Sequence, residues 1–165
     1  MPTLKLKMTE HGVSVRGRVK LPKHTDGDVG FDLYALDHVV IEPHSIALIH
    51  TGWMIADEPI VSGACIHGNL RSLLKIEGRS GLALKGIWPV GGILDPGYRG
   101  EICPIMYNST SAPFQVECGY RIAQLVWYPV VADWYEHGRT VEIIEVSEIS
   151  TSSRGEACLG SSGIT

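Results

Sequence analysis

Long hydrophobic runs, closely paired cysteines and an excess of basic residues are all missing from this sequence of 165 residues. No apolar stretch approaches the ~18–20 residues that a membrane-spanning helix needs. The alternating Leu and Lys of the first ten residues lack the apolar centre of a signal peptide. The four cysteines form no C-x-x-C pair, which favours reduced thiols over disulfides or a zinc site. The net charge of −4 argues against a broad nucleic-acid surface. We therefore expect a cytoplasmic protein that binds neither membranes nor nucleic acid.

The composition and the local patterns predict an all-β protein. Nineteen glycines and nine prolines imply many turns, and β-branched residues dominate the short segments between them. One helical turn is expected at residues 82–85, before Gly86. Many short strands separated by turn signals are typical of a sandwich, jelly roll or barrel. The predicted strands are residues 4–8, 13–16, 39–41, 46–49, 73–76, 102–107, 114–117, 122–127 and 141–146.

The chain is interpreted as one β domain, residues 1–149, followed by a tail. Residues 57–71 lack periodicity and are expected to form a long loop, the length of which suggests a function of its own. Residues 150–165 are rich in Ser and Gly, which is typical of a flexible segment.

Five polar, glycine-rich clusters interrupt the predicted strands. They are residues 28–35 (DVGFDLYA), 78–83 (GRSGLA), 91–102 (GGILDPGYRGEI), 119–125 (GYRIAQL) and 154–163 (RGEACLGSSG). Three of them combine Arg with Gly or Ser, the residue types that bind phosphate through cationic forks and unobstructed main-chain amides. The second cluster also precedes the predicted helical turn, where free amides favour an anion. The carboxylates of Asp28, Asp32 and Asp95 are suited to holding Mg²⁺ or activating a water.

Together and in this order, the clusters resemble the five signature motifs of the trimeric dUTPase family, from about residue 25 to residue 163. The third cluster carries the most specific match, because its pattern is long and agrees almost throughout. The resemblance implies a distorted β jelly roll that forms a homotrimer with active sites at subunit contacts. It also implies Mg²⁺-assisted hydrolysis of dUTP to dUMP and pyrophosphate, by in-line attack of water on the α-phosphate.

The resemblance also implies roles for single residues. Asp95 is expected to be the general base, and Tyr98 to pack against the deoxyribose and exclude a 2′-hydroxyl. Asp32 matches the acidic position at the metal–phosphate end of the site. The remaining positions fall into three groups: Gly92, Ile93 and Leu94 beside uracil; Arg79, Ser80, Gly81 and Gln124 on the phosphates; and Arg154, Leu159, Gly160, Ser161 and Ser162 in the closing tail.

Three features depart from the family pattern. Leu159 replaces the usual aromatic residue that stacks on uracil, Gly78 replaces a residue that is often Pro, and residues 57–71 form an apparent insertion. Two of these departures, the 57–71 loop and Leu159, would fit a rival interpretation, a nucleotide-sensing regulatory protein whose loop binds a protein partner, and such a role is compatible with activity. A second rival, dCTP deaminase, needs a catalytic Glu on the strand after the third motif, and residues 103–105 contain no carboxylate. A purely structural jelly roll would not need the phosphate-type clusters.

Overall fold

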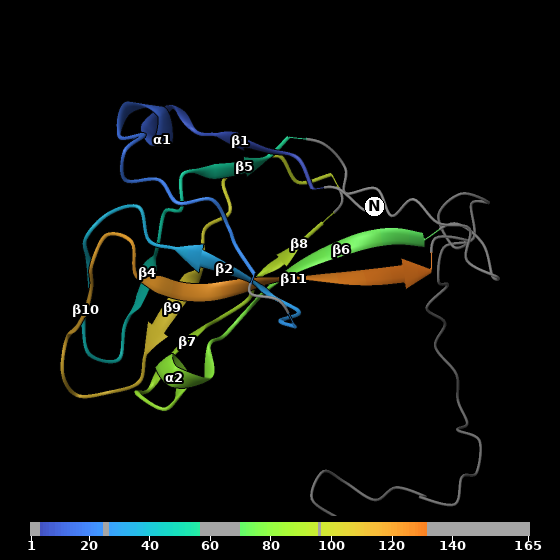
Figure 1. Ribbon diagram of the computed structural model, residues 1–165. Coiled ribbons are helices and arrows are strands. Elements are labelled where there is room, and N and C mark those ends of the chain that lie inside the picture. Colours follow the sequence, from blue (N-terminus) through green and yellow to red (C-terminus); the bar gives the residue numbers. More distant parts are fainter. Residues whose placement is uncertain (1–3, 25–26, 57–69, 96, 132–165) are drawn as a thin grey trace, which may run out of the picture.

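The computed structural model describes residues 4–24, 27–56, 70–95 and 97–131. Strands dominate this part of the chain, in agreement with the all-β prediction (Figure 1). The strands are β1 (Leu6–Met8), β2 (Phe31–Tyr34), β3 (Val39–Ile41), β4 (Ile46–Leu48), β5 (Trp53–Ile55), β6 (Leu70–Glu77), β7 (Ile87–Pro89), β8 (Ile93–Leu94), β9 (Ile105–Asn108), β10 (Phe114–Val116) and β11 (Arg121–Val131).

The described strands form four antiparallel sheets. The largest has the order β2-β11-β6-β8, and a three-stranded sheet has the order β4-β9-β7. The pairs β1-β5 and β3-β10 complete the arrangement. Strand β11 spans much of the molecule in Figure 1, because it pairs with β2 near its start and with β6 along the rest of its length. The order places β8 on the opposite side of β6 from β11.

Two hydrophobic clusters stabilise the sheets. The first packs residues of the four-stranded sheet, including Leu33, Leu74 and Leu125, against β5. The second packs Ile87 and Met106 of the three-stranded sheet against the β3-β10 pair. Burial alternates along β9, as a sheet with one face on the core requires.

A buried amide fastens the turn between β9 and β10 to β3. The side chain of Asn108 is fully buried, and its Nδ2 donates to the main-chain oxygens of Ile41 and Ala112 at 2.9 and 2.8 Å. Its Oδ1 accepts from the main-chain N and the Oγ1 of Thr110. Because every polar atom of the amide has a partner, its burial adds specificity to the fold without an unsatisfied group.

The prediction of a strand at residues 13–16 was wrong. The helix α1 (Glu10–Ser14) occupies this region, and the Oγ1 of Thr9 accepts a hydrogen bond of 2.9 Å from the amide of Gly12. This N-cap stabilises a short helix in which the β-branched Val13 is tolerated. The second helix, α2 (Ser80–Ala83), begins two residues before the predicted helical turn.

Strands β2, β5, β7 and β8 were absent from the sequence prediction. Each spans two to four residues. β2 and β8 lie inside polar, glycine-rich clusters that were interpreted as interruptions between strands. Of the predicted loop, residues 57–69 lie outside the described residues, whereas Leu70 and Arg71 begin β6. The predicted strand at 141–146 and the tail at 150–165 also lie outside them. Neither helix in the described part is long or apolar enough to cross a membrane.

Candidate active site

Asp32, on β2, lies between two arginine side chains that come from different motifs. Oδ1 of Asp32 is 3.0 Å from Nε of Arg79, and Oδ2 is 3.4 Å from Nη1 of Arg121. The side chains of Asp32 and Arg79 are largely buried, whereas that of Arg121 is 55% exposed. One carboxylate and two guanidinium groups leave one net positive charge, so this cluster favours an anion such as phosphate.

The closer of the two ion pairs is not a hydrogen bond. Oδ1 of Asp32 and Nε of Arg79 are buried and have no hydrogen-bond partner in the described part of the chain. Their short separation is therefore an electrostatic contact in which the N–H bond does not point at the oxygen. Nη1 of Arg79 donates instead to the main-chain oxygen of Arg121 at 3.3 Å. A buried polar atom without a partner costs ~1–3 kcal/mol, and the attraction between the opposite charges at 3.0 Å offsets part of that cost.

Gln124 joins this group through the sheet. On β11 it stands opposite Asp32 of β2 and opposite Glu77 of β6. Gly30 makes room for its side chain, because a Cβ atom there would lie 3.1 Å from Cβ and 3.4 Å from Oε1 of Gln124. The first and fourth motifs thus lie on one sheet, and Arg79 of the second motif reaches it through its contact with Asp32.

The exposed residues Ser80 and Gly81 follow Arg79 directly in α2. A Cβ atom at Gly81 would meet no atom within 4 Å. The main chain at this position is therefore open to a ligand.

The third motif runs antiparallel to β6. Ile93 and Leu94 form β8, with Leu94 buried and Ile93 exposed. Gly92 precedes them with a φ of 108°, and its oxygen accepts a hydrogen bond of 2.8 Å from the amide of Ile76. A Cβ atom at Gly92 would lie 2.9 Å from both Cβ and O of Ile76, so only glycine fits this approach.

Asp95 and Tyr98 share the turn that follows β8. The amide of Tyr98 donates to the main-chain oxygen of Asp95 at 2.9 Å, and the carboxylate of Asp95 belongs to an exposed residue. The hydroxyl of Tyr98 donates to the main-chain oxygen of Glu101 at 2.8 Å. A Cβ atom at Gly100 would lie 2.5 Å from this hydroxyl, so the ring lies directly on the glycine. Partial burial, together with Cys103 and Glu101, raises the pKa of Tyr98.

The site residues therefore fall into two groups within one chain. Asp32, Arg79 and Gln124 lie together around β2, β11 and the start of α2. Asp95 and Tyr98 follow β8, which pairs with the other side of β6. The predicted tail residues Arg154, Leu159, Gly160, Ser161 and Ser162 lie outside the described residues.

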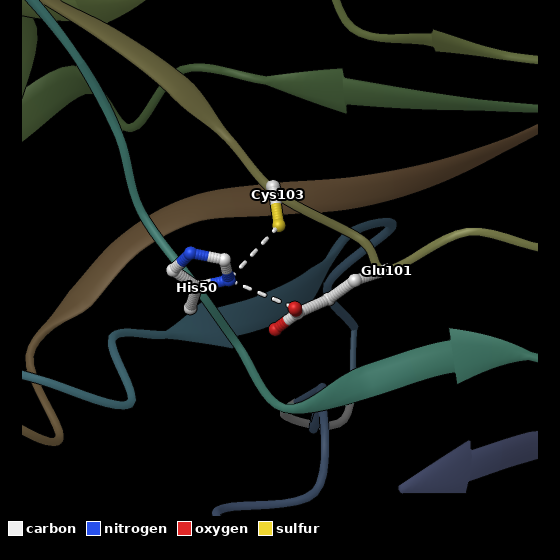
Figure 2. A group of neighbouring side chains, drawn as sticks. All are labelled: His50, Glu101 and Cys103. Carbon is white, nitrogen blue, oxygen red and sulfur yellow. Dashed lines mark hydrogen bonds and ion pairs between the residues drawn. The ribbon is translucent and has the colours of Figure 1, made fainter. Parts of the chain in front are cut away.

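A third cluster was not singled out by the sequence analysis. Nδ1 of His50 lies 2.8 Å from Oε2 of Glu101 and 3.7 Å from Sγ of Cys103, as Figure 2 shows. Burial, with a further contribution from Glu101, raises the pKa of Cys103 to about 12. The only local signal was the spacing of Glu101 and Cys103, because His50 lies 51 residues before Glu101.

Comparisons with known proteins agree on one family. The profile of the dUTPase family matches residues 19–163. A deoxyuridine 5′-triphosphate nucleotidohydrolase of Alkaliphilus metalliredigens is 38% identical over 154 residues, which cover 91% of this chain and 94% of that protein. The enzyme of the same name from Clostridium tetani is 37% identical and aligns with 98% of this chain and 97% of its own length.

Solved structures of phage enzymes share the fold. The dUTPase of Staphylococcus bacteriophage 80alpha with dUpNHpp superposes with a TM-score of 0.70 and 25% identity, covering 98% of this chain and 99% of that one. A mutant dUTPase from phage phi11 of S. aureus, the structure of which details a structural Mg(II) ion, gives a TM-score of 0.63 at 21% identity, over 88% of this chain and 97% of that one. The expectation of an all-β, jelly-roll-like fold is confirmed.

Proposed function

Because the chain belongs to the dUTPase family, it is an enzyme that hydrolyses dUTP, and we propose that Asp95 is the general base of an in-line attack of water on the α-phosphate. The observation that carries this assignment is the turn after β8. This turn presents an exposed carboxylate three residues before a tyrosine ring that is held by its own hydrogen bond. A carboxylate in this position can orient a water and accept its proton as the bond to phosphorus forms.

The phosphates are proposed to bind at the Asp32 cluster. Arg79 and Arg121 supply the positive charge that the leaving pyrophosphate needs, and Asp32 fixes the position of both guanidinium groups. Gln124 offers an amide beside them, and Ser80 and Gly81 add a hydroxyl and exposed main chain. The guanidinium group of Arg79, held beside Asp32, is proposed to donate to a phosphate oxygen.

Mg²⁺ is proposed to arrive with the triphosphate and to lie near Asp32. A carboxylate oxygen is the ligand type that Mg²⁺ prefers, and Asp32 is the carboxylate that contacts both arginines proposed to bind the phosphates. Since the cluster carries a net positive charge by itself, it needs the negative phosphates to hold a divalent cation. When bound, the ion neutralises charge on the phosphate oxygens.

The nucleoside is proposed to bind along the third motif. The main chain of Gly92, Ile93 and Leu94 can read uracil through its amides and carbonyls. The ring of Tyr98 is proposed to fill the space that a 2′-hydroxyl would need. Its hydrogen bond to Glu101 O keeps the ring in one orientation, which is what a steric filter requires.

The tail residues keep the roles that the family resemblance implies. Arg154, Gly160, Ser161 and Ser162 are proposed to close over the triphosphate, with Leu159 over the base in place of the usual aromatic residue. Closure of this kind would exclude bulk water from the reacting groups. We place the reaction in the cytoplasm, which suits the free thiols of Cys103 and Cys118.

We also propose that the enzyme is a homotrimer whose active sites lie between subunits. The two groups of site residues lie on opposite sides of β6 within one chain, as expected if neighbouring chains complete each other's sites. The outer face of the sheet β4-β9-β7 supports the assembly. It presents Ile46, Leu48, Trp88, Ile105 and Tyr107, which the strand register places side by side. Ile46 is 61% exposed and Leu48 is 49% exposed, and a continuous apolar face of this kind is typical of a contact surface.

The assembly is tested by light scattering on a size-exclusion column. Wild type should elute with the mass of three chains, and Ile46→Glu with Leu48→Glu should elute as one chain. Val13→Glu, which changes an exposed valine of α1, is the control and should remain trimeric. A monomeric wild type with full activity would refute the shared-site proposal.

The reaction itself is tested by pyrophosphate release from dUTP, dCTP, dTTP and UTP, with and without Mg²⁺. Asp95→Asn should lower kcat for dUTP by ~10²–10⁴-fold while the Kd for a non-hydrolysable analogue changes little. Asp37→Asn, which alters a surface carboxylate paired with His11, should behave as wild type. Near-normal turnover by Asp95→Asn would remove Asp95 from the mechanism.

A further inference from the structure

We propose that His50, Glu101 and Cys103 form a binding site for a divalent transition-metal ion of the zinc type, made of side chains that the proposed hydrolysis does not use. One imidazole nitrogen, one carboxylate and one sulfur lie within 4.8 Å of one another. Figure 2 shows the three side chains converging from two segments of the chain. The combination of thiolate, imidazole and carboxylate is selective for zinc-like ions, because Mg²⁺ and Ca²⁺ prefer oxygen ligands alone.

The pairing of β4 with β9 brings His50 and Cys103 together. Leu48 stands opposite Ile105, and the pairing continues when the amide of Ile49 donates to the oxygen of Pro104 at 2.9 Å. His50 and Cys103 are the next residues outward on these two segments. Their side chains therefore share the face that carries Leu48 and Ile105.

The third ligand residue, Glu101, is held in position by main-chain amides. Oε1 of Glu101 accepts hydrogen bonds from the amides of Thr51 and Gly52 at 3.0 and 2.7 Å. Those bonds occupy one oxygen and direct the other, Oε2, toward His50. Hydrogen bonds of this kind, from the protein to the side chain of a metal ligand, orient the ligand and limit the rearrangement that metal binding requires.

The ligand separations are close to those of a tetrahedral zinc site. Zinc–ligand bonds of ~2.0–2.3 Å imply about 3.6 Å between nitrogen and sulfur and about 3.3 Å between nitrogen and oxygen. The nitrogen–sulfur distance here is 3.7 Å, and the nitrogen–oxygen distance is 2.8 Å because a hydrogen bond joins these atoms. A shift of about half an ångström by His50 would bring the nitrogen–oxygen distance to the tetrahedral value, and its side chain is 48% exposed. The sulfur of Cys103 and the carboxylate of Glu101 lie within 4.8 Å of each other.

Binding replaces the hydrogen bond between His50 and Glu101 by bonds from both residues to the ion. The S–H bond of Cys103 breaks at the same time, and its proton passes to the solvent. In the single chain the exposure of the His50 side chain leaves the fourth ligand position open. Because His50 shares the face proposed as the subunit contact, water or a neighbouring subunit would fill that position in the trimer. Because the ion would link the segment after β4 to the segment before β9, its binding also raises the stability of the folded chain.

The test is a titration with Co²⁺, which reports thiolate ligation through a charge-transfer absorption band. The full-length chain is used in a Cys65→Ser, Cys158→Ser background, so that Cys103 and Cys118 are the remaining thiols. We expect one equivalent of Co²⁺ to give the band and one equivalent of Zn²⁺ to abolish it. Cys103→Ser should lose the band, and His50→Ala should bind at least about ten-fold more weakly.

A matched pair of variants serves as the control. His38 lies 3.4 Å from Glu117, which precedes the exposed Cys118, so the same residue types recur without converging on one point. His38→Ala and Cys118→Ser should titrate as the parent chain does. Far-ultraviolet circular dichroism and dUTP hydrolysis should confirm that Cys103→Ser remains folded and active.

Two results would overturn the proposal. One is a folded parent chain that gives no thiolate band, and the other is a band that survives Cys103→Ser. Either result would leave the three residues as a hydrogen-bonded network and would not affect the assignment of the hydrolysis site.

Discussion

Nε of Arg79 lies 3.0 Å from Oδ1 of Asp32, yet neither atom has a hydrogen-bond partner in the described part of the chain. The pair thus balances charge inside the protein while leaving donor capacity unused. An arginine in this state is suited to receive a phosphate oxygen, because the guanidinium group is already fixed and partly removed from water.

Arg79→Lys should lower kcat/KM for dUTP by ~10–100-fold, since an ammonium group keeps the charge but loses the planar donor set. The comparison is Arg16→Lys, which changes an exposed arginine before β2 and should leave kcat/KM unaltered. Steady-state pyrophosphate release measures both. Equal kcat/KM for the two variants would show that the guanidinium geometry of Arg79 is not used.

Gly100→Ala should raise the ratio of UTP to dUTP hydrolysis by about ten-fold. The added methyl group would lie 2.5 Å from the hydroxyl of Tyr98 and must displace the ring. Gly97→Ala is the matched control in the same turn, because a Cβ atom there meets no atom within 4 Å. If Gly100→Ala and Gly97→Ala show the same ratio of UTP to dUTP hydrolysis, the position of the Tyr98 ring does not set the selectivity for deoxyribose.

Gly92→Ala should destabilise the fold more than Gly91→Ala, although both glycines have positive φ values. The strained backbone conformation costs ~1–2 kcal/mol in each variant. At Gly92 the new Cβ atom also overlaps main-chain and side-chain atoms of Ile76, whereas at Gly91 it meets nothing within 4 Å. The overlap should add ~1–3 kcal/mol. Urea unfolding measures the difference, and equal free energies of unfolding would contradict the contact with Ile76.

Asn108→Leu should lower the free energy of unfolding by ~2–4 kcal/mol, because it removes the buried amide that donates to the main-chain oxygen of Ile41 and accepts from Thr110. Thr110→Val removes only the hydroxyl bonds at the margin of this network and should cost about 1 kcal/mol. Thermal unfolding of both variants provides the measurement. A larger loss of stability in Thr110→Val than in Asn108→Leu would mean that Thr110, and not Asn108, holds the turn between β9 and β10 in place.

The sequence by itself predicted β3, β4 and β10, because short runs of apolar and β-branched residues stand there between turn signals. It missed α1, since a helix of five residues has too little length for a helical period to emerge. The N-cap at Thr9 was the available signal. The short strands β7 and β8 were missed because their pairing partners, not their composition, define them.

The candidate site residues could also be identified from the sequence. Phosphate binding and water activation restrict the residue types to arginine, glycine and carboxylates, and these stand at short spacings in the motifs. Tertiary structure alone decided which of them meet. Asp32 and Arg79 are 47 residues apart in the sequence. The pairing of β2 with β11 and of β11 with β6 brings them together. His50 reaches Glu101 and Cys103 through the pairing of β4 with β9. Antiparallel pairing brings distant residues together in a register that local sequence does not encode, and that register created both clusters.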